Sequence, residues 1–248
     1  MRNIFVAAWL VIAFCPSALA DSKAAAFEEA GAKYRAGEFK KAEALYEEIS
    51  EARPTTAVYY NLGNASFRAG HKGRALVSYR RAQRLAPRDR DLLWNIGILK
   101  GALIDRFDRR AANFIFLSLK EAVDFVAMNE LVWAFTTGTM ALAGICLLAF
   151  LFPPLRPGKR PLAVLMMLCL LGLSALLAFK WMDEKDPRAV VLDREIFARY
   201  GPSDKESRAF ALHEGAEGRV LDHSRDWIYL GMADGKTGWV PETACEIV

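Results

Sequence analysis

Histidine and cysteine are scarce in this chain, and the motifs that usually accompany catalysis are missing. The 248 residues contain three histidines and four cysteines. His71, His213 and His223 are not spaced as ligands of one metal ion. No nucleophile elbow, phosphate-binding loop or dinucleotide fingerprint occurs. We therefore predict no enzymatic activity, no catalytic residue, no metal site and no cofactor.

A large excess of one charge is also missing. The formal net charge is +4, and basic residues are mixed with acidic ones. This balance argues against a nucleic-acid-binding surface. Two long apolar runs, at 131–152 and 162–181, hold no Asp, Glu, Arg or His, and Lys180 lies only at an end. A transport or proton path usually needs such charges, so we predict that these runs serve as an anchor.

The cysteines do not form a disulfide framework. Cys15 lies in the N-terminal apolar segment, and Cys146 and Cys169 lie in the two long runs at similar depth. Only Cys245 remains in the polar part of the chain, without a partner of its own. We predict that Cys146 and Cys169 act as small apolar packing residues.

The first twenty residues are typical of a secretory signal peptide. Arg2 precedes an eleven-residue apolar stretch at 4–14, which is too short to span a bilayer. Ala18 and Ala20 then form a small-x-small cleavage site. The alternative is a lipoprotein signal at Cys15, which the bulky Phe14 disfavours.

The two long runs predict a membrane hairpin. An α-helix of about 20 apolar residues crosses a bilayer, so residues 131–152 and 162–181 are predicted transmembrane helices. The nine-residue link at 153–161 is too short to cross again. It carries three basic residues and no acid, which predicts a cytoplasmic loop. Both flanking parts would then lie outside the cytoplasm, as the signal peptide requires.

Residues 21–111 show helical hydrophobic spacing that repeats about every 34 residues. One copy contains Gly37, Tyr46 and Pro54, and the next contains Gly70, Tyr79 and Pro87. This pattern resembles the tetratricopeptide repeat (TPR), an all-α helical repeat. A last helix near 92–108 is predicted to cap the stack with its apolar residues, namely Ile96, Ile98, Leu99, Leu103, Ile104 and Phe107.

The resemblance implies a concave groove that binds a protein partner. The predicted groove residues are Tyr34, Tyr60, Asn61, Asn64, Phe67, Arg68 and Trp94. Asn61, Asn64 and Asn95 are candidates to bond a peptide backbone or a C-terminal carboxylate, with Arg68 supplying charge. Packing between helices is the alternative role of these side chains. Residues 112–130 form an amphipathic connector that either lies on the membrane surface or packs on the stack.

Residues 187–248 change to short apolar alternations separated by turns. Asp234-Gly235, between Tyr229 and Trp239, is a two-residue hairpin signal. The pattern predicts a small all-β barrel and resembles bacterial SH3-like domains. The resemblance gives four predicted ligand-binding residues: Trp227, Tyr229, Trp239 and Pro241. Ala244 and Leu192 stand where SH3 grooves usually carry aromatics, so the pattern does not favour a proline-rich ligand.

The order of signal peptide, TPR repeats, connector, two-span hairpin and SH3-like barrel resembles the BatE family of the bacterial aerotolerance (Bat) operon. This resemblance implies a mixed multi-domain protein of the bacterial inner membrane, with both folded parts in the periplasm. It also implies membrane partners with von Willebrand A domains and, indirectly, a MoxR-type ATPase. The alternatives are a peptidoglycan-binding or wall-sensing protein that uses the barrel, and a signalling receptor, which the short cytoplasmic loop disfavours.

Overall fold

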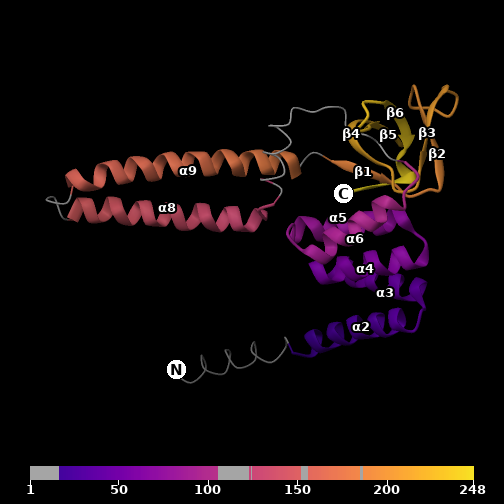
Figure 1. The fold of residues 1–248 in the computed structure, drawn as a ribbon, viewed down its shortest axis with the longest axis horizontal. Helices are drawn as coiled ribbons and strands as arrows, with labels where there is room; N and C mark the ends of the chain where they lie inside the picture. The colour runs from indigo at the N-terminus through magenta and orange to yellow at the C-terminus, as the bar shows by residue number, and fades with distance from the viewer. Residues whose placement is uncertain (1–16, 106–122, 124, 152–155, 185–186) are drawn as a thin grey trace, which may run out of the picture.

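The N-terminal helices of the computed structural model form an antiparallel stack. The structure describes residues 17–105, 123, 125–151, 156–184 and 187–248, so most of the predicted signal peptide and connector lies outside the described residues. The helices are α2 (Ser17–Arg35), α3 (Phe39–Ala52), α4 (Thr56–Ala69), α5 (Lys72–Leu85) and α6 (Arg90–Gly101). Consecutive helices reverse direction and pack side by side (Figure 1).

Local signals set where these helices start and stop. The side chain of Thr55 accepts a hydrogen bond from the Val58 N–H, and that of Asp89 accepts one from the Leu92 N–H. Gly70 ends α4 with φ of 91°, a left-handed conformation that favours glycine. Gly63 lets α4 and α5 approach, because a Cβ there would lie 2.5 Å from the Tyr79 ring. These features confirm the predicted TPR-like helical pairs.

The last helix of the stack differs from its prediction. α6 ends at Gly101 rather than near residue 108. Ile96, Leu99 and Leu103 are buried as expected, but Ile98 is 48% exposed and Ile104 68% exposed. The prediction that these two isoleucines cap the stack is therefore wrong, because α6 buries one face only. Phe107 lies outside the described residues.

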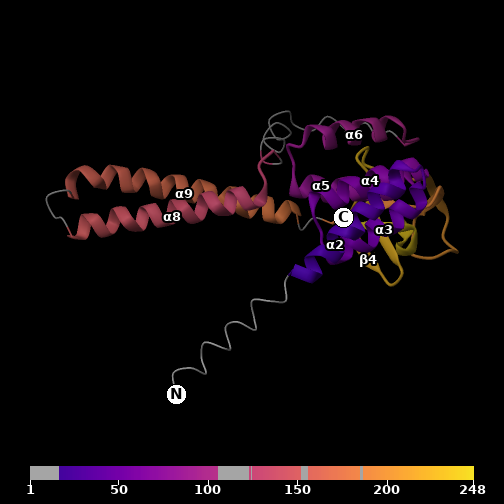
Figure 2. The same cartoon turned by 90° about the horizontal axis from the view of Figure 1, so that it is seen from below.

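Two long helices, α8 (Met128–Leu151) and α9 (Arg156–Glu184), run side by side away from the rest of the molecule (Figure 1). Both are long and apolar enough to cross a membrane. α9 begins at Arg156, inside the segment predicted as a loop, and contains Pro161. The helical stack and the C-terminal part of the chain both lie at the same end of this hairpin (Figures 1 and 2).

The C-terminal part is a curled antiparallel sheet. Its strands are β1 (Arg188–Val191), β2 (Glu195–Arg199), β3 (Arg208–His213), β4 (Glu217–Ser224), β5 (Trp227–Gly231), β6 (Thr237–Pro241) and β7 (Cys245–Ile247), with the 3₁₀ turn η2 (Glu242–Ala244) before β7. The strand order is β3-β2-β6-β5-β4-β1-β7. One apolar cluster draws residues from strands across the whole sheet, so the sheet closes around its own core. This confirms the SH3-like barrel.

Strand β1 is buried on both faces. Ala189 and Val191 pack into the barrel core, whereas Val190 packs into the cluster formed by α5 and α6. Leu192 and Val248 lie against the same helical cluster. The barrel and the helical stack therefore share apolar packing and are not two separate modules.

Candidate protein-binding sites

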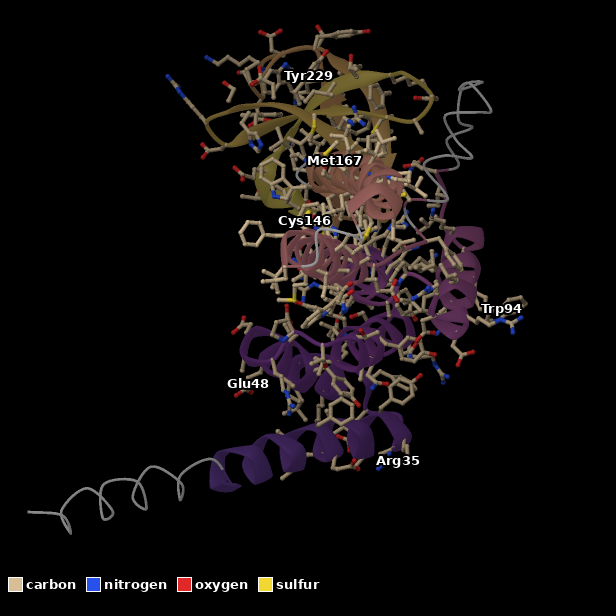
Figure 3. The ribbon with its side chains drawn as sticks, turned by 90° about the vertical axis from the view of Figure 1, so that its left-hand side faces the viewer. Arg35, Glu48, Trp94, Cys146, Met167 and Tyr229 are labelled. Carbon is tan, nitrogen blue, oxygen red and sulfur yellow. The ribbon has the colours of Figure 1, made fainter. Side chains whose placement is uncertain are left out.

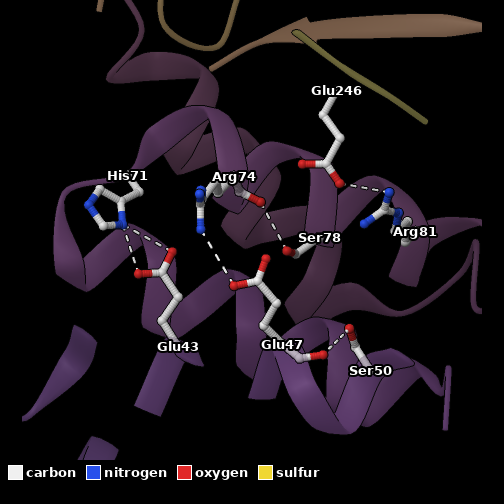
Figure 4. Close-up of polar contacts among 8 residues, drawn as sticks. All are labelled: Glu43, Glu47, Ser50, His71, Arg74, Ser78, Arg81 and Glu246. Atoms are coloured by element: carbon white, nitrogen blue, oxygen red, sulfur yellow. Dashed lines mark hydrogen bonds and ion pairs between the residues drawn. The ribbon is translucent and has the colours of Figure 1, made fainter. Parts of the chain in front are cut away.

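Ion pairs lie on both sides of α5, and one of them joins the stack to the barrel (Figure 4). On one side of α5, Arg74 pairs with Glu47 of α3 at 3.5 Å, and His71 lies 2.7 Å from the carboxylate of Glu43. On the other side, Arg81 of α5 pairs with Glu246 of β7 at 2.8 Å. Strand β7 thus faces α5 much as α3 does.

A further ion pair, more enclosed than the pair of Arg81 with Glu246, joins Arg80 of α5 to Glu217 of β4. Their closest atoms are 2.6 Å apart, and each side chain is 19% exposed. Burial acts to raise the pKa of Glu217, but the Arg80 guanidinium, together with Arg188, holds that pKa below its ordinary value. Glu217 therefore stays ionised and attracts α5 at neutral pH.

Backbone contacts fix the same interface. The Gly73 N–H donates to Glu214 Oε1 at 2.9 Å, which satisfies a free donor in the first turn of α5. A Cβ on Gly73 would lie 2.6 Å from the Val191 carbonyl oxygen. After α6, Asp105 accepts hydrogen bonds from the His213 N–H and lies 2.9 Å from the His213 ring nitrogen. Hydrogen bonds at Gly73 and at His213 thus fix how the barrel packs against the stack.

A hydrogen-bonded network of predicted groove residues and Tyr79 joins α4, α5 and α6. The Tyr79 hydroxyl donates to Asn64 Oδ1 at 2.7 Å, and Asn95 Nδ2 donates to the same oxygen at 2.9 Å. Asn95 Nδ2 also donates to the Tyr60 hydroxyl at 3.1 Å. Burial and the neighbouring Tyr60 raise the pKa of Tyr79, so its hydroxyl keeps its proton. The network orients both amides.

The other predicted groove residues do not belong to this network and differ in their contacts and exposure. Tyr34 stacks edge-on against Phe39, and the Arg68 guanidinium lies 4.5 Å from the centre of the same ring. Phe67 packs partly into the helical core. Trp94 is 71% exposed and projects sideways from α6 (Figure 3). Asn61 is half-buried next to the network without a hydrogen bond to the described residues.

The four predicted barrel residues lie on one face of the sheet. Trp227 stands opposite Pro241, and Tyr229 stands opposite Trp239, in the register of β5 and β6. The Tyr229 and Trp239 rings are 5.0 Å apart, and all four side chains are half-buried. Figure 3 shows Tyr229 on the side of the barrel away from the helical stack. We call these four residues the aromatic patch.

Two further barrel residues are used for packing. Leu192, at a position where SH3 grooves often carry an aromatic, is covered by the helical cluster. Burial raises the pKa of Cys245 to about 12, and the charge of Asp193 acts in the same direction. The Cys245 thiol therefore stays protonated and does not behave as a reactive nucleophile.

The sequence interpretation missed the joint between stack and barrel. One signal was available: α5 carries five basic side chains and no acidic one, whereas the barrel is rich in acids. A second was the unbroken apolar run at β1, which is typical of a strand buried on both faces. The repeat pattern identified Tyr79 only by its position in the repeat, and it did not predict the hydrogen bond by which the Tyr79 hydroxyl orients Asn64.

Comparisons with known proteins agree with parts of this fold. The tetratricopeptide repeat family matches residues 56–89, which span α4 and α5. Among solved structures, the C-terminal SH3 domain of myosin IB from Entamoeba histolytica is similar to this chain. The match has 17% identity and a TM-score of 0.19 and covers 25% of this chain and 93% of that chain. No curated protein matches the chain in sequence. The TPR repeat and the SH3-like fold together support a protein-interaction scaffold.

Proposed function

We propose that this protein is a non-enzymatic scaffold, anchored in the bacterial inner membrane by α8 and α9, with both folded parts in the periplasm. The observation that carries the proposal is the hydrogen-bonded network of Tyr60, Asn64, Tyr79 and Asn95, which connects the matched TPR repeat at 56–89 to α6. The length and composition of α8 and α9 support the anchor. The position of both folded parts at one end of the hairpin supports their sharing one compartment (Figure 1).

The network favours a peptide main chain over a C-terminal carboxylate. Asn64 Oδ1 already accepts two hydrogen bonds, which leaves its amide N–H groups as donors. Asn95 Nδ2 already donates twice, which leaves its carbonyl oxygen as an acceptor. A peptide group offers one acceptor and one donor and matches both, whereas a carboxylate only accepts. The groove is therefore suited to an extended segment of a partner.

The order of the parts supports partners of the Bat type: membrane proteins with von Willebrand A domains and, through them, a MoxR-type ATPase. The test is co-purification of these proteins with the tagged full-length chain from detergent-solubilised membranes. The expected result is recovery that falls with Asn64→Asp, which keeps the acceptor for Tyr79 and removes the amide donors. Gln83→Glu is the matched control because it adds the same charge on α5, outside the predicted groove residues, and keeps the acceptor for Arg80. Equal recovery with both variants would count against the groove.

The aromatic patch supports a second candidate function, binding of peptidoglycan. Tyr229 and Trp239 present an aromatic surface on the side of the barrel away from the stack. Sedimentation of the full-length protein with purified sacculi tests this function. Retention that is lost in Tyr229→Ala/Trp239→Ala, but kept in Asn64→Asp, would assign wall binding to the barrel. The full chain is needed because the barrel shares its packing with the stack.

A further inference from the structure

We infer that the groove takes its ligand from the plane of the membrane, namely an extended segment that directly follows or precedes a transmembrane span of a neighbouring membrane protein. This inference rests on the proposed scaffold function and adds the class of partner. Its basis is the way the helical stack is held over the hairpin. The turn between α5 and α6 contacts the hairpin, and this contact sets the height of the groove above the membrane. The direction of the stack helices sets how the groove is oriented relative to the membrane.

The turn between α5 and α6 is tied to the start of α8. Arg88 forms an ion pair with Glu130 in the first turn of α8, and its guanidinium lies 5.3 Å from the centre of the Phe125 ring. Glu130 also accepts a hydrogen bond from the Ala127 N–H at 3.1 Å. The apolar span of α8 begins at Met128. The Arg88 turn therefore lies at the level of the headgroups when α8 crosses a bilayer.

A second contact braces the same end of the hairpin. Lys180, near the end of α9, is only 8% exposed and donates hydrogen bonds to the carbonyl oxygens of Val123 and Val126. These carbonyls belong to the chain just before α8. Both helices of the hairpin are thus connected to the segment that leads into the Arg88–Glu130 contact, so the stack and the hairpin meet at this end.

The helices of the stack run away from the bilayer. α6 starts beside Arg88, and α4 starts at the same end because consecutive helices reverse direction. Figures 1 and 2 show these helices lying roughly along the direction of the hairpin. With a rise of about 1.5 Å per residue, Trp94 lies about 6 Å beyond the start of α6, and Asn64 about 12 Å beyond the start of α4. The whole groove side lies within about 20 Å of the membrane surface.

The stack also presents an exposed side chain sideways, along the membrane plane. Figure 3 looks along the hairpin, and there Trp94 projects from one flank of the stack while Glu48 of α3 lies on the opposite flank. Trp94 and Tyr60 each lie four residues beyond the starts of α6 and α4, near the bilayer, whereas Arg68 lies near the far end of α4. An extended chain rises about 3.3 Å per residue, so about two to six residues beyond a span reach these heights. Confinement of such a segment to the same membrane raises its effective concentration at the groove.

Site-specific photocrosslinking in native membranes tests this inference. The probe is p-benzoylphenylalanine at position 94 of the full-length chain, with the same residue at position 48, on the opposite flank, as the control. The expected result is crosslinks from position 94, absent from position 48, that map within about ten residues of a span in another membrane protein. Crosslinks from position 94 to soluble proteins, or to sites far from any span, would overturn the inference and leave the scaffold function standing. No crosslink above the position 48 control would overturn both.

A second variant tests the orientation itself. Arg88→Gln with Glu130→Gln removes the ion pair and leaves Trp94, Asn64 and the barrel joint unchanged. The juxtamembrane crosslinks from position 94 are expected to fall at least about threefold, because a groove that tilts freely loses the benefit of confinement. Unchanged crosslinking would show that this contact does not present the groove to the membrane plane.

Discussion

The helical stack is joined to its two neighbours in different ways. Its joint with the barrel combines shared apolar packing around Val190, the enclosed Arg80–Glu217 pair and backbone contacts at Gly73. Its joint with the hairpin includes an ion pair and a ring contact made by Arg88, whose side chain is 46% exposed. Burial of apolar area supplies stability, whereas an exposed ion pair supplies little of it. We therefore expect the stack and the barrel to unfold together, and the hairpin to affect orientation more than stability.

The largest effect is expected from Gly73→Ala. The new Cβ meets the Val191 carbonyl oxygen at 2.6 Å and the Leu192 Cα at 3.1 Å, and neither backbone atom moves easily. We expect a loss of about 3 kcal/mol in unfolding free energy and separation of one unfolding transition into two. Urea unfolding of the full-length protein in detergent, followed by near-UV and far-UV circular dichroism, measures both.

Gly97→Ala is the matched control for that substitution. A Cβ on Gly97 would meet nothing within 4 Å, so the helix-favouring residue is expected to be neutral or to stabilise by about 0.5–1 kcal/mol. A Gly73→Ala protein that unfolds in a single transition at the wild-type urea concentration would show that the barrel is not rigidly docked.

Arg80→Met is expected to cost about 2 kcal/mol. The substitution keeps the apolar stem of the side chain but removes the nearest positive charge from the enclosed Glu217, whereas Arg188 lies farther away at 3.6 Å. Adding Glu217→Gln to this variant should recover part of the loss, since no enclosed charge then remains. A double-mutant cycle on urea-unfolding free energies measures the coupling, and strictly additive effects would contradict it.

The same pair predicts the acid sensitivity of the joint. The folded-state pKa of Glu217 is lowered below its ordinary value of 4.5, so its contribution is fully present above that value. The contribution is lost as pH falls through the lowered folded-state pKa. Glu217→Gln should therefore flatten the pH dependence of stability below about pH 4.5 and leave its slope near neutral pH unchanged. Unfolding midpoints measured from pH 7 to pH 3 check this, and parallel curves for both proteins would contradict it.

Ser66→Ala tests the stack apart from either joint. The Ser66 hydroxyl is fully buried, and no hydrogen-bond partner reaches it among the described residues. Removal of an unsatisfied hydroxyl should stabilise the protein by about 0.5–1 kcal/mol. An increase in the urea midpoint is the expected result. A decrease would indicate that water satisfies this hydroxyl inside the stack.

The smallest effect on stability is expected at the hairpin joint. Arg88→Gln should change the unfolding free energy by less than about 0.5 kcal/mol, because the pair is exposed. The distribution of distances between spin labels at positions 94 and 182, measured by pulsed electron paramagnetic resonance, should nevertheless broaden. Exchange of the two residues in Arg88→Glu/Glu130→Arg should narrow it again. A loss of unfolding free energy as large as that of Arg80→Met would show that the two joints contribute equally to stability.

Much of the architecture follows from local patterns in the sequence. The spacing of Gly37, Gly70 and Pro87 predicted where helices end, and Asp234-Gly235 predicted the β5–β6 turn. The resemblance to SH3-like domains supplied the four residues of the aromatic patch, and the register of β5 and β6 pairs them as Trp227 with Pro241 and Tyr229 with Trp239. The end of α6 and the exposure of Ile98 and Ile104 were not predicted. Helical spacing alone does not show which face of a helix packs against another element.

The sequence by itself determined the kinds of elements present, because hydrophobic period, turn residues and run length are properties of short segments. Only the tertiary structure decided that β7 pairs with α5 through Glu246 and Arg81, that Val190 faces α5, and that Tyr79 fixes the orientation of Asn64. These features join residues far apart in the chain. They depend on the fit of surfaces and on the partners available to each buried donor, which no local pattern encodes.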